Sequence, residues 1–79
     1  MPRFHLNIVN GDGASADEEG MELPDLAGAR AEAIRGIRSI LASEIGGGTI
    51  DLGGRIEIAD TEGRILETIA FEQAVTILR

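Results

Sequence analysis

Polar and apolar residues alternate near the start of the chain. Phe4, Leu6 and Ile8 would line one face of an extended strand, and the polar residues between them would line the other. The Asn-Gly and Asp-Gly pairs in residues 10–13 tolerate the backbone angles of a tight turn. The pattern predicts a half-buried strand that ends in a turn, and residues 21–23 are a short candidate strand to pair with it.

A helical pattern follows Pro24. The Asp25 carboxylate can accept hydrogen bonds from the free N–H groups of a first helical turn, and its charge suits the positive helix end. Glycines at residues 46–48 end the pattern, because glycine is a poor helix former and readily takes the cap conformation. We therefore predict one long amphipathic helix packed on a sheet. Its apolar stripe, at spacings of three and four, is Leu26, Ala29, Ala33, Ile37, Ile40 and Leu41.

Two further strands are predicted after the helix. Residues 50–59 read as a strand interrupted by two glycines, and residues 64–71 read as its antiparallel partner across a glycine-containing turn. Residues 72–79 are predicted to form a short helix or an irregular tail. The predicted fold class is α+β, as one domain over residues 1–79. A small antiparallel sheet of three or four strands, in the order strand, strand, helix, strand, strand, carries the helix on one face.

The pairing of the last two strands decides which residues face the helix. If Asp60 pairs with Arg64 through a bulged turn, Ile65, Ile69 and Phe71 face away from the helix. A pairing shifted by one residue would instead bury a glutamate, which is costly without a partner. We therefore expect the first register, and its outward apolar residues need cover. Ile65, Ile69 and Phe71 are predicted to bind a protein partner or a second copy of the chain, as a homodimer.

The composition excludes several function classes. Fourteen acidic residues face seven basic ones, all of them arginine, and the net charge of −7 would repel phosphate and anionic lipid. We therefore expect no nucleic-acid partner and no membrane partner. The chain has no cysteine, which excludes disulfides and thiolate chemistry, and no apolar run long enough for a signal peptide or a membrane span. The expected location is the cytoplasm.

The residues that carry chemistry are few. His5 is the one histidine, and no residue in the sequence pattern is placed to orient it as an acid, base or nucleophile. Lysine, tyrosine, tryptophan and cysteine are absent, and no serine lies in a nucleophile motif. We therefore predict no catalytic residue, no cofactor and no enzymatic activity.

The acidic segment over residues 12–20 is a candidate cation site. Carboxylate oxygens are the ligands that calcium prefers, and glycines would let the segment wrap around an ion. The order of residues departs from the EF-hand pattern at Ala14 and Ser15, so an exposed acidic loop is the competing interpretation. The candidate ligands are Asp12, Asp17, Glu18 and Glu19.

Several short motifs resemble one family over nearly the whole chain. They are the Pro2-Arg3-Phe4 start, the segment Asp17-Glu18-Glu19-Gly20 with Glu22-Leu23-Pro24-Asp25, and Glu57-Ile58-Ala59-Asp60 with Gly63. The chain is similar in these motifs to short bacterial proteins of unknown function, for which no catalytic residues are established. The order of elements is also similar to the small domain of HicB-type antitoxins, which bind a partner toxin, and this analogy implies a protein partner.

Two functions are therefore expected from the sequence. The first is a small non-enzymatic interaction or regulatory module that binds a protein partner, because the chain is short, acidic and poor in catalytic groups. The alternative is a small-ligand or divalent-cation sensor that uses the acidic loop over residues 12–20.

Overall fold

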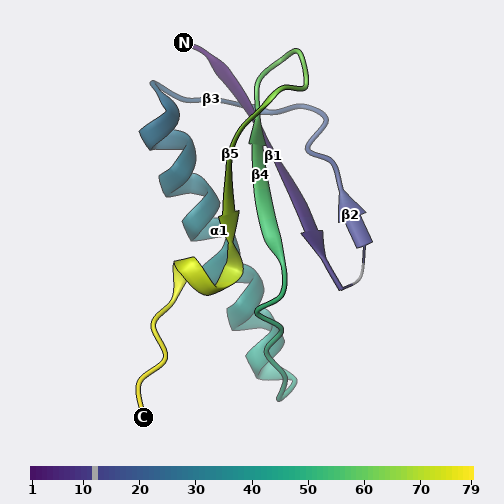
Figure 1. The fold of residues 1–79 in the computed structure, drawn as a ribbon, viewed down its shortest axis with the longest axis vertical. Coiled ribbons are helices and arrows are strands. Elements are labelled where there is room, and N and C mark those ends of the chain that lie inside the picture. Colours follow the sequence, from purple (N-terminus) through teal and green to yellow (C-terminus); the bar gives the residue numbers. More distant parts are fainter. Residues whose placement is uncertain (12) are drawn as a thin grey trace.

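The computed structural model describes residues 1–11 and 13–79 as one long helix against an antiparallel sheet (Figure 1). The predicted α+β class is confirmed. The sheet order is β2-β1-β4-β5, and β3 pairs with the same outer edge of β1 as β2 does. In chain order the elements are β1 (Arg3–Asn10), β2 (Gly13–Ser15), β3 (Met21–Glu22), α1 (Leu26–Gly46), β4 (Arg55–Ala59), β5 (Ile65–Ala70) and the 3-10 helix η1 (Phe71–Ala74).

Helix α1 begins and ends where the sequence predicts. The Asp25 carboxylate accepts a hydrogen bond from the Gly28 N–H at 2.8 Å, which satisfies one free donor of the first turn. Gly48 follows the helix at a φ of 90°, a conformation that favours glycine. No helix in the described residues is long and apolar enough to cross a membrane.

The core lies between α1 and one face of the sheet. The helix contributes a buried stripe with the predicted spacing, and the two alanines of this stripe, Ala29 and Ala33, allow the backbone of α1 to approach the strands closely. Leu6 and Ile8 are only partly buried and lie at the margin of this core. The buried core residues are Phe4, Ala29, Ala33, Ile37, Leu41, Ile56, Ile58, Ile69, Phe71 and Ala74.

The segment before β4 corrects one expectation. A strand was expected from residue 50, but β4 begins at Arg55, and residues 50–54 form turns and irregular structure. The Phe71 N–H donates to the Gly54 carbonyl at 2.9 Å, and the Phe71 ring lies against this glycine. A Cβ atom at Gly54 would lie only 2.7 Å from that ring, so the close approach requires glycine at this position.

The pairing of β4 with β5 corrects a second expectation. Ala59 pairs with Ile65, but Ile58 pairs with Glu67, so Leu66 is an extra residue that forms a bulge. The bulge turns Ile69 and Phe71 toward the helix, where they are 3% and 0% exposed. The expected outward orientation of these two residues is therefore wrong.

The register expected from the sequence holds at the turn, where the Asp60 N–H donates to the Arg64 carbonyl at 2.9 Å and Ala59 pairs with Ile65. It fails from Ile58 onward because it kept one offset along the whole strand. The bulge keeps the tight turn and also returns the apolar residues after it to the core. Glu67 moves to the helix side of the sheet, where its carboxylate forms an ion pair with Arg30 of α1. The side chain of Glu67 keeps 30% of its surface exposed, so the burial penalty expected for this carboxylate does not arise.

Candidate functional site

Among the residues that the structure describes, no helix covers the face of the sheet opposite α1 (Figure 1). Directly paired residues of antiparallel strands point to the same face, so the register defines which side chains lie together there. Across β1, β4 and β5 the helix-free face carries three rows, which are His5-Ala59-Ile65, Asn7-Glu57-Thr68 and Val9-Arg55-Ala70.

The first row contains a dip at its centre. Ala59 projects only a methyl group, whereas His5 on one side and Ile65 on the other are larger side chains. Ala59 is 2% exposed and forms the floor of a surface hollow of about 230 Å³. The hollow is lined by His5, Asn7, Asp17, Ala59, Asp60, Thr61 and Gly63.

Asp17 forms one wall of this hollow and hydrogen-bonds to the outer edge of β1. The outer edge of β1 is paired with β3 at one end and β2 at the other, and Asp17 fills the gap between them. Its carboxylate accepts the Leu6 N–H through Oδ2 and the Gly20 N–H through Oδ1, both at 3.1 Å. Its own N–H donates to Asn7 Oδ1 at 2.8 Å. The acidic segment is therefore attached to the sheet at Asp17.

The orientation of His5 follows from the same attachment. His5 Nδ1 lies 2.6 Å from the Asp17 carbonyl oxygen. A carbonyl oxygen only accepts hydrogen bonds, so Nδ1 carries a proton, and Nε2 is an acceptor when the ring is neutral. Within residues 1–11 and 13–79, neither His5 Nε2 nor the Asn7 amide nitrogen makes a hydrogen bond. Both residues line the hollow, so its walls include side chains with unused hydrogen-bonding atoms.

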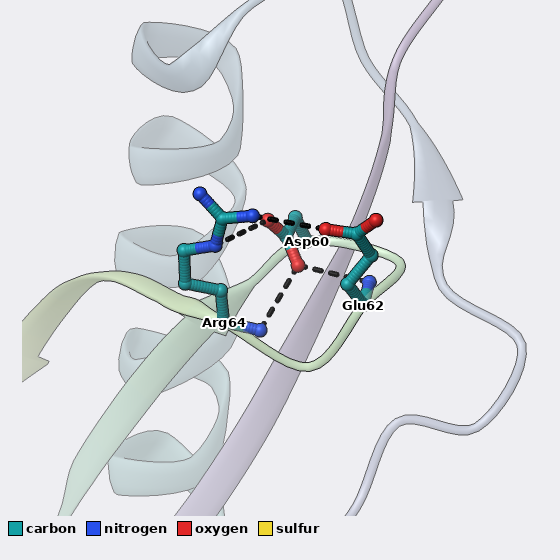
Figure 2. Close-up of polar contacts among 3 residues, drawn as sticks. All are labelled: Asp60, Glu62 and Arg64. Carbon is teal, nitrogen blue, oxygen red and sulfur yellow. Dashed lines mark hydrogen bonds and ion pairs between the residues drawn. The ribbon is translucent and has the colours of Figure 1, made fainter.

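The opposite wall is the turn between β4 and β5 (Figure 2). Asp60 Oδ1 accepts the backbone N–H groups of Glu62 and Arg64, both at 2.9 Å. The Arg64 guanidinium lies 3.6 Å from Asp60 Oδ2 and 2.9 Å from the Glu62 carboxylate. Gly63 takes a φ of 85°, which permits the tight reversal.

These contacts change the ionisation of Asp60. The hydrogen bond from the Arg64 backbone N–H lowers the pKa of the Asp60 carboxyl below its ordinary value, against a smaller opposing effect of partial desolvation. The Glu62 N–H and the charge of the Arg64 guanidinium lower the pKa further. Asp60 is therefore anionic at neutral pH, in a turn whose geometry its own carboxylate stabilises.

Three of the four predicted cation ligands, Asp17, Glu18 and Glu19, lie in the part of the chain that the structure describes. Asp12 lies outside the described residues. The Asp17 carboxylate accepts two backbone N–H groups, and Glu18 and Glu19 are exposed. Over residues 1–11 and 13–79, no group of three or more histidine, cysteine or acidic residues is placed to hold a metal ion.

The predicted partner-binding residues are divided between two surfaces. Ile65 is 52% exposed and lies on the helix-free face beside the hollow, whereas Ile69 and Phe71 belong to the core. Sequence reasoning assigned no role to Ala59 or Thr61. The polar positions of β1 were a signal for one wall of the hollow, but the other wall becomes adjacent only through the strand pairing.

The fold and the hollow define a class of small α+β domain, with one helix on one sheet face and a polar hollow on the other. A family model described as a domain of unknown function, DUF6894, matches residues 3–72, so the chain belongs to the DUF6894 family. All residues that line the hollow fall within the matched range. No curated protein and no solved structure matches the chain.

Proposed function

We propose that this domain is a non-enzymatic interaction module that binds a protein partner through the helix-free face of its sheet. The observation that carries the proposal is the first row of that face, where the polar hollow lies next to exposed Ile65. Protein interfaces commonly combine an apolar anchor with polar groups that fix its position. The row supplies both features on one rigid sheet.

The size of the hollow supports a protein partner over a metabolite. Small-molecule sites usually enclose about 300 to 1,000 Å³ and bury most of the ligand. The hollow of about 230 Å³ is smaller and lies on a sheet surface. It suits the end of one side chain from a partner.

The edge of β5 is a weaker binding surface than the face. Addition of a partner strand needs a regular edge with free backbone groups. The bulge at Leu66 distorts the start of this edge, and the Ala70 N–H at its end donates to Gln73 Oε1 at 2.6 Å. Glu67 adds a charge between them, and charges on edge strands oppose pairing. These features favour binding on the face.

A second copy of the chain is one protein partner that the proposal includes. The expected homodimer relied on outward Ile69 and Phe71, so a dimer would now need to form through Ile65 and the hollow. The architectural likeness to HicB-type antitoxins also favours a protein partner over a small ligand. Because the chain has no cysteine, we propose a reducing, cytoplasmic setting for this interaction.

Site-specific photo-crosslinking in cells tests the proposal. A photoreactive side chain at Thr61 or Ile65 should give a discrete protein adduct, because both positions are exposed beside the hollow. The same group at Ser39, an exposed position on α1, is the matched control. An adduct of twice the 8.3 kDa chain mass would identify a homodimer. Equal labelling at all three positions, or no adduct at Thr61 and Ile65, would refute binding through this face.

A further inference from the structure

The polar side chains that line the hollow carry mostly hydrogen-bond acceptors. In the neutral ring with its proton on Nδ1, His5 Nε2 is an acceptor. Each oxygen of the Asp17 carboxylate accepts one backbone N–H and retains a second acceptor position. The Asn7 amide nitrogen and the Thr61 hydroxyl are the donors among the lining side chains. A group that enters the hollow is therefore favoured if it donates several hydrogen bonds.

The charge of the hollow points in the same direction. Two carboxylates, those of Asp17 and Asp60, line it, and no lining residue is an arginine. The nearby arginines have other partners, since Arg3 binds the Glu19 carbonyl and the Glu22 carboxylate, while Arg64 pairs within its turn. With a net charge of −7 over the chain, this surface attracts cationic groups.

We propose that the hollow receives the side-chain end of an arginine presented by the protein partner. This inference rests on the proposed function and names the chemistry of its contact. A guanidinium presents five N–H donors in one plane, which reach acceptors on separate walls, whereas an ammonium concentrates its donors at one point. Ile65, next to the hollow, provides an apolar surface for the methylene stem of the arginine.

Titration with a minimal probe tests this chemistry in the intact chain. N-acetyl-arginine methylamide should shift the backbone NMR signals of His5, Asn7 and Gly63 in a saturable way, with a Kd on the order of 1 to 10 mM for so small a contact. The matched citrulline compound keeps the shape but lacks the charge, and the lysine compound keeps the charge but lacks the planar group. We expect both to bind at least about fivefold more weakly.

A pair of matched variants separates the hollow from general charge attraction. Ala59→Val fills the floor of the hollow without changing the net charge, and it should abolish the saturable shifts. Ala70→Val adds the same two carbon atoms in the third row of the same face and should preserve them. The citrulline and lysine comparisons use the unchanged chain, so they remain decisive if Ala59→Val folds poorly.

Three results would overturn the assignment of arginine. The first is that the citrulline or the lysine compound binds as tightly as the arginine compound. The second is that the NMR shifts spread over Glu18, Glu19 and Glu22 instead of the hollow. The third is that no signal near the hollow shifts at a probe concentration of about ten times the expected Kd. The crosslinking experiment separates this failure from failure of the proposed function. If adducts form at Thr61 and Ile65 but the arginine compound causes no NMR shifts, the proposed binding face is supported and arginine is excluded as its target.

Discussion

Replacing Phe71 with alanine tests the observed register of β4 and β5 directly. The ring is 0% exposed and packs against Gly54 in the core. Removing a fully buried phenylalanine side chain costs about 3 to 5 kcal/mol, because apolar contacts are lost and a cavity remains. At about 0.05 to 0.15 kcal/mol per residue, a chain of 79 residues has a margin of about 4 to 12 kcal/mol. The substitution therefore removes a large share of the stability.

Leu66→Ala is the matched control on the same strand. Leu66 is the extra residue of the bulge and is 41% exposed, so its truncation should cost less than about 1 kcal/mol. The uniform register expected from the sequence reverses this order, because it would place Leu66 against Ile58 and turn Phe71 outward. The ranking of the two variants thus distinguishes the two registers without dependence on the absolute values.

Urea unfolding followed by circular dichroism gives the free energy of unfolding for each variant. Phe71→Leu, with a smaller expected loss of about 1 to 2 kcal/mol, provides a measurable value if the alanine variant does not fold. A loss for Phe71→Leu below about 0.5 kcal/mol, together with a larger loss for Leu66→Ala, would contradict the bulged register.

Three further predictions concern single contacts. Gly54→Ala should lower the free energy of unfolding by about 1 to 3 kcal/mol, because the added methyl group would clash with the Phe71 ring. Gly46→Ala, which has open space at its Cβ, should raise the free energy of unfolding by about 0.4 to 1 kcal/mol. Urea unfolding of both variants measures these opposite changes. A double-mutant cycle on Arg30 and Glu67 should give a coupling of about 0.2 to 1 kcal/mol that falls at high salt, because both side chains are partly exposed, and a coupling unchanged by salt would contradict the ion pair. The lowered pKa of Asp60 means that its ionised form stabilises the fold above its ordinary pKa, and that this contribution is lost as the pH falls through the lowered pKa. Asp60→Asn should therefore flatten the acid side of the stability curve, measured by urea unfolding at a series of pH values, and an unchanged acid side would contradict this role.

The elements predicted best from the sequence are those defined by one period. The stripe from Leu26 to Leu41 follows the helical period, and the alternation of Phe4, Leu6 and Ile8 follows the strand period, so each predicts its own buried face. Asp25 and the glycines at residues 46–48 mark the helix ends through local hydrogen bonding and backbone freedom. None of these predictions depends on a distant partner.

The candidate site depends on distant partners throughout. Ala59 forms a floor only because His5 and Ile65 pair on either side of it, and these three residues come from three strands. Asp17 looks like part of an exposed acidic loop in the sequence, yet its carboxylate takes the place of a strand beside Leu6. A carboxylate that binds backbone N–H groups leaves no periodic signal, so the sequence pattern does not distinguish it from its exposed neighbours.

The bulge at Leu66 connects the core to the proposed binding surface. Ile65 and Ile69 are four positions apart, and in a regular strand two residues at this spacing point to the same face. One extra residue between them places Ile69 under the helix and leaves Ile65 on the helix-free face beside the hollow. A strand without the extra residue would place both isoleucines on the same face of the sheet. Either the core or the helix-free face would then lack an isoleucine at this position. The same local irregularity therefore completes the core and provides the apolar anchor next to the polar hollow, which explains why an error of one residue in register changed both the predicted core and the predicted site.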